Sequence, residues 1–531
     1  MANVFSRLLN REKTPQSQPI PGREPEMVPN RAGGFAFQLD AWAQLDRFLI
    51  LGTEGATYYA SEREMTLENV GNLRACIAED GRRVIERVVE MDRGNRAPKM
   101  TPLLFALATA HHLGNAAAKA AAVEAVPRLC RTGTHLYEYL GYQKLLGGWL
   151  GRSKRRAVER WVNLQAPEDL AYLLVKYQNR NGWCFRDVLR AAHPKVEGEE
   201  RQALVRWAVK GEPPPDAEWN GRVQGLEKMK TAATAEEAKT LIERYRLPRE
   251  CVPTQWLNDA GIWELLLQEM PMTAMLRNLG KMGQVGLLAP FSAAAERVVA
   301  KLADTERLRR SRIHPIQVLS ALAVYRQGHG ERGKLTWTPV PQVIDALDGA
   351  FEASFHAVEP SGLRFYLGLD VSGSMTMGRI AGVPGLTPHV AEACMALVTL
   401  RREPVCYCAA FDTGMRPIAL TAKSSLPEAM KATQGHFGGT DCAQPMLDAL
   451  AKKIPVDTFV IYTDNETWAG ARHPVQALRE YRQKMGIPAK LIVVGFTATA
   501  YTIADPRDGG MLDVVGFDSA APAVMSEFAR A

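Results

Sequence analysis

Amphipathic stripes fill the first two thirds of the chain. From about residue 31 to 355 apolar residues recur at helical spacing, short Gly, Pro or Asn interruptions separate the segments, and no convincing pair of strands is found. One stripe is formed by Leu39, Trp42, Leu45 and Leu49. The others cover Leu103–Ala110, Ala117–Val126, Leu170–Tyr177, Ala235–Tyr245, Leu265–Leu279, Ala293–Leu302 and Pro315–Tyr325. Successive helix pairs without one long apolar helix predict an all-α, HEAT-like helical repeat.

The pattern changes after about residue 361. Short apolar runs bounded by turn residues predict strands at Arg364–Asp370, Val405–Phe411, Thr458–Thr463, Lys490–Phe496 and Leu512–Phe517. Helical stretches lie between them at Pro388–Arg401, Cys442–Lys453 and Val475–Met485. Strands that alternate with helices predict a Rossmann-like α/β domain with a doubly wound, mainly parallel sheet. In such a sheet ligands bind at the carboxyl ends of the strands.

Length and composition indicate a multidomain chain. With 531 residues, 46% of them hydrophobic and 23% charged, the sequence is too long for one compact core and is not of a disordered or disulfide-scaffold type. The first 29 residues are rich in Pro, Gln, Arg and Glu and lack apolar periodicity, which predicts a flexible arm. We therefore expect an arm at 1–29, a helical domain at 30–357 and an α/β domain at 358–531.

No feature of the sequence indicates a membrane or an oxidising compartment. No apolar run approaches the roughly eighteen residues of a membrane span, and Arg7, Arg11 and Lys13 interrupt the short apolar stretch at the start. The eight cysteines form no C-x-x-C pair, so a structural zinc site is not expected. We expect a cytoplasmic protein with reduced thiols.

The net positive charge lies in the first part of the chain. Residues 361–531 contain 16 Lys and Arg and 16 Asp and Glu, whereas residues 1–360 contain 49 and 42. All of the net charge of +7 therefore belongs to residues 1–360, which contain the helical part. Any surface for a polyanion is expected there, although an excess of this size alone is weak support for nucleic acid.

Oxygen-bearing side chains follow two predicted strands of the α/β domain. The first strand ends in Asp370-Val371-Ser372-Gly373-Ser374, and the third is followed by Asp464. Between them, a Gly-rich loop that enters a helix carries Thr440. Carboxylate and hydroxyl oxygens are hard ligands suited to Mg²⁺. The alternative is that the first of these loops is merely a tight turn.

The same five residues resemble a known metal site. D-x-S-x-S, then Thr, then Asp is the pattern of the metal-ion-dependent adhesion site of von Willebrand factor A domains. The resemblance implies that Ser372, Ser374 and Thr440 supply hydroxyl ligands and that Asp370 and Asp464 bind directly or through water. It also implies that a partner protein's carboxylate can take the open coordination position.

Basic residues gather in the middle of the helical part. Lys176 and Arg180 are four residues apart, and so are Arg186 and Arg190, which predicts that each pair shares a helix face. The strip continues through His193 and Lys195, and Tyr177, Trp183 or His193 could stack on unpaired bases. A second cluster lies upstream, at Arg152, Lys154, Arg155, Arg156 and Arg160. For both clusters a solvated helix face is a serious alternative to RNA contact.

Several stretches of the helical part resemble the TROVE module, the ring-forming region of Ro and related proteins. They are Ala32-Gly33-Gly34, the run from Leu45 to Gly52 with Tyr58-Tyr59, the run from Met270 to Leu279, and His314-Pro315-Ile316. The similarity spans about residues 30 to 357, and its junction with the Asp370 loop matches the Ro family, most closely its bacterial members.

This resemblance implies a non-catalytic function. Ro proteins bind structured Y RNA on the outside of the ring, and Lys176, Arg180 and His193 match positions implicated in that contact. Unpaired ends of misfolded RNA pass through the positively charged hole, which fits recognition by shape and strandedness. The family also implies a scaffold role in RNA quality control or processing, with delivery of RNA to a 3′-to-5′ exoribonuclease.

Enzyme motifs are incomplete. The stretch from Gly328 to Lys334 nearly forms a P-loop, but Leu335 replaces the required Ser or Thr, and the stretch follows a helix instead of a strand. No G-x-S-x-G or H-E-x-x-H motif occurs. Two rival functions stay open: a protein-binding A-domain scaffold without RNA, and a metal-dependent nuclease that uses Asp370 and Asp464.

Overall fold

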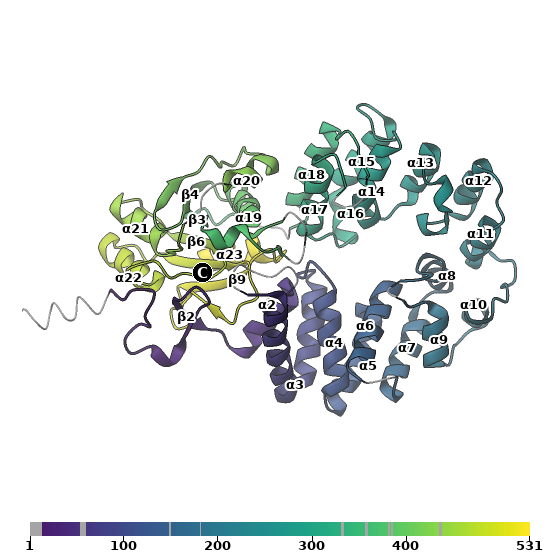
Figure 1. Cartoon of the computed structure of the whole chain (residues 1–531), viewed down its shortest axis with the longest axis horizontal. Coiled ribbons are helices and arrows are strands. Elements are labelled where there is room, and N and C mark those ends of the chain that lie inside the picture. Colours follow the sequence, from purple (N-terminus) through teal and green to yellow (C-terminus); the bar gives the residue numbers. More distant parts are fainter. Residues whose placement is uncertain are drawn as a thin grey trace, which may run out of the picture.

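The middle of the chain is built of helices (Figure 1). The computed structural model describes residues 13–531 apart from 54–59, 148–149, 181, 331–333, 356–358, 381–382, 384–385 and 435–437. Its α-helices up to residue 353 are α2 (Ala41–Leu51), α3 (Glu62–Arg93), α4 (Thr101–Leu113), α5 (Ala116–Leu129), α6 (Gly133–Leu145), α7 (Arg152–Leu164), α8 (Pro167–Lys176), α9 (Phe185–Ala192), α10 (Glu199–Lys210), α11 (Gly221–Met229), α12 (Ala235–Tyr245), α13 (Ala260–Glu269), α14 (Met272–Gln284), α15 (Ala293–Ala303), α16 (Thr305–Arg310), α17 (Pro315–Arg326) and α18 (Pro341–Ala353). Short 3-10 turns occur at η1 (Glu24–Glu26), η2 (Glu218–Asn220), η3 (Arg249–Cys251) and η4 (Thr254–Trp256).

No helix among the described residues is long and apolar enough to cross a membrane.

The predicted amphipathic stripes fall on helices, except that Leu39 precedes α2 and Tyr177 follows α8, so the prediction of an all-α helical repeat is confirmed. The stripe Leu265–Leu279 is divided between α13 and α14. Met270 is extended and Pro271 is the N-cap of α14, because a proline disfavours helical geometry at the residue before it. The P-loop-like stretch follows helix α17, and its residues 331–333 lie outside the described part.

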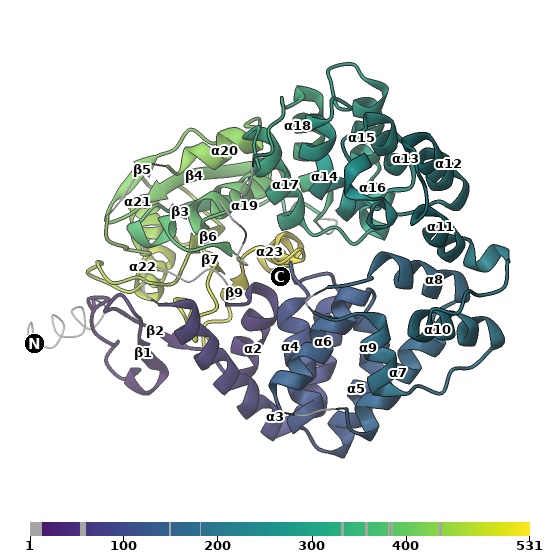
Figure 2. The ribbon, with the colours of Figure 1, turned by 45° about the vertical axis from the view of Figure 1, so that its right-hand side comes forward.

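The helical part closes on itself. Arg312 Nη2 lies 3.5 Å from Asp92 Oδ1, His314 Nε2 bonds the Arg96 carbonyl at 3.2 Å, and Gln317 Nε2 donates to the Pro98 carbonyl at 3.4 Å. These partners are about 220 residues apart in sequence. The helices therefore form two arcs whose ends meet beside the α/β domain (Figures 1 and 2). We call residues 41–353 the helical ring.

The α/β domain contains a six-stranded sheet in the order β5-β4-β3-β6-β7-β9. Its strands are β3 (Arg364–Asp370), β4 (Val405–Phe411), β5 (Met415–Pro417), β6 (Thr458–Thr463), β7 (Lys490–Gly495) and β9 (Met511–Val515). Its helices are η5 (Gly373–Thr376), α19 (Pro388–Arg402), α20 (Leu426–Ala432), α21 (Gln444–Ala451), α22 (Pro474–Met485) and α23 (Ala521–Arg530). All pairs are parallel except β4 with β5, so the predicted doubly wound architecture is confirmed. The three-residue edge strand β5 was too short to predict.

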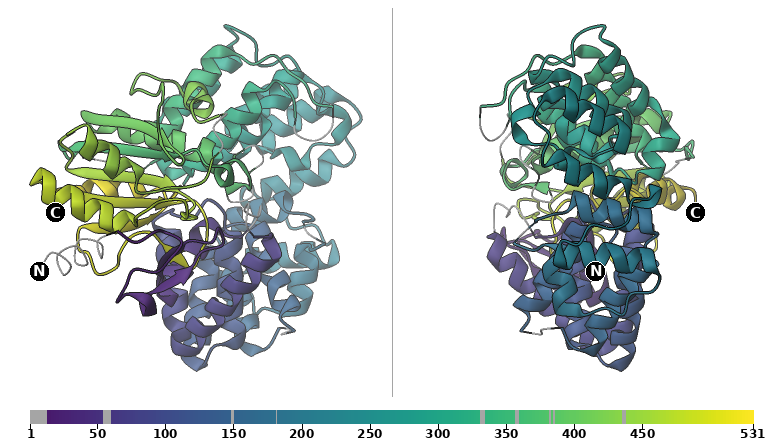
Figure 3. Two further views of the ribbon diagram at one scale, coloured as in Figure 1. Left: turned by 60° about the vertical axis from the view of Figure 1, so that its left-hand side comes forward. Right: turned by 90° about the vertical axis from the view of Figure 1, so that its right-hand side faces the viewer.

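Residues 13–38 form part of the α/β domain, where the sequence predicts a flexible arm through residue 29 and no strand pair near residue 35. Strands β1 (Met27–Pro29) and β2 (Phe35–Gln38) form a three-stranded sheet with β8 (Tyr501–Thr502) (Figure 3). Gln16 is fully buried, and its Nε2 donates to Asp441 Oδ1 and to the Arg472 carbonyl, each at 2.7 Å. The flexible-arm prediction is wrong for these residues because their partners lie more than four hundred positions away in the sequence.

Replacing Gln16 with Ala is expected to lower the free energy of unfolding by about 1–3 kcal/mol, because buried partners would lose their hydrogen bonds. The urea midpoint of unfolding measures the effect. Ser17→Ala, at an exposed neighbouring position, is the matched control and should leave the midpoint unchanged. Equal midpoints for the two variants would show that the segment is not an integral part of the domain.

Candidate functional site

Two strand ends place their acidic residues next to each other in the sheet. Strand β3 ends at Asp370, and Asp464 directly follows β6. The strands are hydrogen-bonded neighbours, and β4 lies on the other side of β3. After β3 the chain adds β4 on one side of this strand and then β6 on the other. The order of strands therefore reverses between β3 and β6, and doubly wound sheets bind ligands at such a switch point.

The five predicted metal ligands are all buried at this point. Asp370, Ser372, Ser374, Thr440 and Asp464 are each less than 5% exposed. Short loop contacts hold their positions. Ser372 N donates to Asp370 Oδ1 at 3.0 Å, and the hydroxyls of Ser372 and Ser374 lie 3.2 Å apart. The Thr440 loop is tied to the same place because Gly373 N donates to the Gly438 carbonyl at 3.3 Å.

A third buried carboxylate, Glu392 on α19, supports the Asp370 loop. Its Oε2 accepts from Asp370 N at 3.1 Å, while Oε1 is buried and has no hydrogen-bond partner among the described residues. Sequence reasoning missed Glu392. Its signal was a single acidic residue in a helix that is mostly apolar up to Leu400.

The electrostatics of this site favour a cation. Burial and the neighbouring Asp464 raise the pKa of Asp370, burial raises the pKa of Asp464, and burial together with Asp370 raises the pKa of Glu392. Among the described ion pairs, no Lys or Arg neutralises these three carboxylates. Arg379 lines the same pocket but forms no described ion pair with these carboxylates. Hydroxyls and carboxylates that converge without a paired basic residue fit a hard divalent ion, which would supply the missing charge. No group of three or more His, Cys, Asp or Glu that could hold a metal ion occurs among the described residues, so an ion at this site would need the hydroxyl oxygens as well as the carboxylates as ligands.

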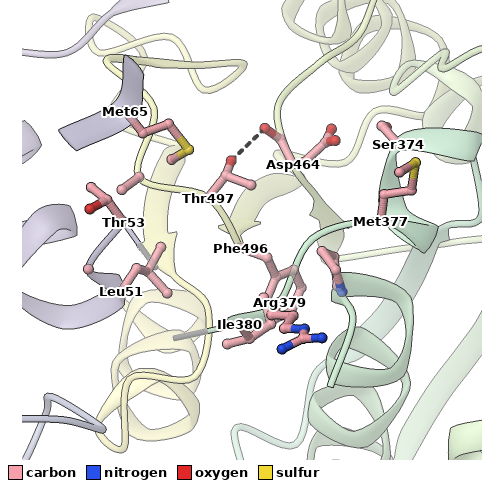
Figure 4. Close-up of a pocket in the computed structure, with 13 residues that line it drawn as sticks. Leu51, Thr53, Met65, Ser374, Met377, Arg379, Ile380, Asp464, Phe496 and Thr497 are labelled. Atoms are coloured by element: carbon pink, nitrogen blue, oxygen red, sulfur yellow. Dashed lines mark hydrogen bonds between the residues drawn. The ribbon is translucent and has the colours of Figure 1, made fainter. Parts of the chain in front are cut away.

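The helical ring forms one wall of the pocket above this site. Figure 4 shows Leu51, Thr53 and Met65 of the ring opposite Ser374 and Asp464 of the α/β domain. Asp464 is also linked to the ring through Thr497. The Thr497 hydroxyl donates to the Asp464 carbonyl at 2.9 Å, and the Thr497 carbonyl accepts from Arg47 Nη1 of α2 at 3.3 Å. The sequence alone did not reveal that the ring takes part in this pocket.

The basic strip is arranged differently from its prediction. Helix α8 ends at Lys176 and Arg180 follows in a turn, so the prediction that they share a helix face is wrong. Lys176 is half-buried and its Nζ donates to Tyr172 Oη at 2.6 Å, while Arg180 lies 3.7 Å from Glu250. Asn181 of this segment, like Tyr58 and Tyr59, lies outside the described residues.

The remainder of the strip is exposed. Arg186 and Arg190 lie four residues apart on helix α9, as predicted. His193 ends that helix in a left-handed conformation, and both His193 and Lys195 are exposed. Of the possible stacking residues, Tyr177 and Trp183 are half-buried against the core.

The second cluster lies on helix α7, which contacts α9. Arg152, Arg155 and Arg156 are exposed on one side of α7. Lys154 is only 6% exposed and its Nζ lies 3.4 Å from His112 Nδ1. It is therefore not part of the exposed basic cluster that was predicted from the sequence. Arg160 pairs with Glu124 at 2.6 Å. The two clusters thus lie on neighbouring helices (Figure 2).

Comparison with known families and proteins agrees with this two-part architecture. A model described as the TROVE domain matches residues 28–324, and one described as the Ro60 vWA domain matches residues 364–529. The chain belongs to the Ro60 family. RNA-binding protein RO60 of Deinococcus radiodurans is 45% identical over 534 residues, which cover 100% of this chain and 99% of that relative.

Two further comparisons extend the match. RNA-binding protein RO60 of Caenorhabditis elegans is 36% identical over 94% of this chain and 90% of its own length. The crystal structure of the Deinococcus radiodurans RO (RSR) protein has a TM-score of 0.70 and 46% identity, and the match covers 92% of this chain and 99% of that one. The sequence-based assignment to a Ro family of bacterial type is therefore confirmed.

Replacing Arg47 with Met is expected to lower the free energy of unfolding by about 3–5 kcal/mol, because a nearly fully buried guanidinium would no longer pair with Asp513. The urea midpoint of the full chain measures this loss. Arg82→Met removes an exposed helical ion pair with Glu86 and should cost less than about 1 kcal/mol. Equal effects would mean that Arg47 does not anchor the ring to the Ro60 vWA domain.

Proposed function

We propose that this chain is a non-catalytic RNA-binding protein. The observation that carries the proposal is the 45% identity, over the full chain, to a protein named RNA-binding protein RO60. The charge distribution supports it, because all of the net positive charge belongs to the part that contains the helical ring. Exposed arginines on helices α7 and α9 supply cations that phosphates could contact.

The RNA class that fits this surface best is a small structured RNA of the Y RNA type. The basic residues are spread over several helices, an arrangement suited to backbone contacts along a folded RNA. In our proposal the outer strip holds structured RNA, the ring accepts unpaired ends of misfolded or immature RNA, and the protein is a scaffold that presents RNA to a separate 3′-to-5′ exoribonuclease.

We also propose that Asp370, Ser372, Ser374, Thr440 and Asp464 hold Mg²⁺ or a similar divalent cation. The buried carboxylates without a basic partner support this. A small acidic group, such as a partner protein's carboxylate, could complete the coordination. Because the ring walls the pocket, such a group would also contact the ring.

Lys176→Ala combined with Arg180→Ala is expected to weaken binding of structured RNA by about 10- to 100-fold, and to reduce the slope of log affinity against log salt by about 2, because two phosphate contacts are lost. Filter binding of copurified RNA at several salt concentrations measures both quantities. Lys452→Ala combined with Lys453→Ala removes equal charge from the neutral α/β domain and serves as the control. Unchanged affinity and slope in the first variant would refute this placement of the RNA.

Asp370→Ala is expected to abolish the heat of Mg²⁺ binding in calorimetry, because a buried carboxylate of the site is removed. Asp345→Ala, at an exposed position on α18, should bind Mg²⁺ as the parent chain does. RNA binding should persist in Asp370→Ala. If RNA is instead cleaved in Mg²⁺ by the parent chain and not by this variant, the protein is a nuclease and the scaffold proposal fails.

A further inference from the structure

We propose that a cavity where the two ends of the helical ring meet binds one unpaired nucleotide. This site is separate from the basic strip on helices α7 to α9, although the choice of ligand rests on the proposed RNA function. The cavity has a volume of about 420 Å³, which is in the range of small-molecule sites. A base with its sugar and phosphate is a ligand of this size class.

Three parts of the chain line this cavity. Pro98 and Lys99 come from the loop before α4, most of the remaining lining comes from helices α14 and α17, and Val383 comes from the α/β domain. The hydrogen bond from Gln317 to the Pro98 carbonyl crosses the same seam. A ligand here would therefore contact both ends of the ring at once.

The charge of the lining suits an anion. Lys99, Arg277 and Lys281 line the cavity, and no Asp or Glu among the described residues does. Lys281 Nζ donates to the neutral oxygens of Asn258 and Gln284, each at 2.8 Å. In the described structure neither Arg277 nor Lys281 pairs with a carboxylate. A phosphate would thus meet two cationic groups, Arg277 and Lys281, that no described carboxylate neutralises.

The rest of the lining suits a flat, partly apolar group. One wall of the cavity is apolar and contains Leu276, Val324, Leu335 and Trp337. The indole is fixed because its Nε1 donates to the Tyr325 carbonyl at 2.8 Å. It packs so closely on Gly280 that a Cβ there would lie 2.7 Å from the ring. Three polar side chains, Thr273, Gln317 and Ser320, also line the cavity and could bond a base edge.

The ligand is expected to be unpaired. A base within a duplex is stacked and hydrogen-bonded to its partner, so it cannot enter a cavity of this size without leaving the helix. An RNA end or loop offers an unpaired nucleotide without the free-energy cost of unstacking a base pair. A free nucleoside monophosphate has the same chemistry, and the experiment must separate the two sources.

Arg277→Ala combined with Lys281→Ala in the full chain tests the proposal. The probe is a fluorescein-labelled, single-stranded ten-nucleotide RNA followed by anisotropy. We expect affinity to fall about 10-fold or more and the salt slope to fall by about 1.4, since each phosphate contact on a single strand contributes about 0.7. Binding of a blunt-ended hairpin RNA should stay within twofold of the parent chain.

The control variants separate this proposal from the previous one. Lys452→Ala with Lys453→Ala should bind both probes normally, and Lys176→Ala with Arg180→Ala should lose chiefly the hairpin. If the cavity variant binds the ten-nucleotide RNA within twofold and with the same slope, the cavity proposal is overturned. The outer strip would still stand if its own variant loses the hairpin.

Competition identifies the source of the ligand. Displacement of the probe by UMP or AMP at concentrations near their own Kd, lost in the Arg277 and Lys281 variant, would assign the cavity to free nucleotides. Failure of the monophosphates to compete, with 4-thiouridine at the RNA end crosslinking to residues on α14 or α17, would assign it to RNA ends. Either result supports a nucleotide site. If the monophosphates do not compete and the RNA does not crosslink to these helices, a nucleotide site is excluded.

Discussion

The meeting of three segments at residues 92–98 is the constraint on which the rest of the molecule depends. Asp92 lies in the last turn of α3 and Arg96 in the loop between α3 and α4, near the start of the helical ring. From the end of the ring, Arg312 pairs with Asp92. From the α/β domain, Asp518 pairs with Arg96: its Oδ2 lies 2.5 Å from Arg96 Nη2. An amphipathic repeat alone would give an open solenoid, so these polar contacts between distant segments are what convert it into a ring.

The metal-type site depends on its surroundings in a similar way. Buried carboxylates are costly unless a cation or hydrogen bonds compensate them. Here backbone N–H groups and hydroxyls compensate in part: Thr463 Oγ1 donates to Asp370 Oδ2 at 2.6 Å, and Glu466 N donates to Asp464 Oδ1 at 3.0 Å. Glu466 in turn accepts from the backbone of Arg31 and Ala32. The N-terminal segment therefore helps to hold the loop that carries a predicted ligand.

Features set by local sequence were predictable, and features set by distant contacts were not. The strands β3, β4 and β6 have the predicted bounds because a short apolar run between turn residues is a local signal. The convergence of the five oxygen-bearing residues was predictable because each lies at a strand end or in a loop near one, and that they bind a metal ion stays a prediction. In contrast, the burial of Gln16 and Lys154 and the ring wall above Asp464 depend on partners remote in sequence. The early end of α8 misled the prediction for Arg180, since helix boundaries are weakly encoded. The sequence did not predict that Lys99 and Arg277 line the same cavity, because only the closure of the ring brings them close together.

The strand pair formed by β1 and β2 has a consequence for how the chain is divided. Because residues 27–38 complete a sheet with β8, the α/β domain begins before the ring and finishes after it. The ring is in this sense an insertion within another domain, with both of its ends tethered to the same body. Its aperture can therefore change only by flexing distributed through the two arcs, or by breaking the contacts at residues 92–98. A fragment that starts at residue 358 would also expose an unpaired edge of β8, so the two halves of this protein are not separable units.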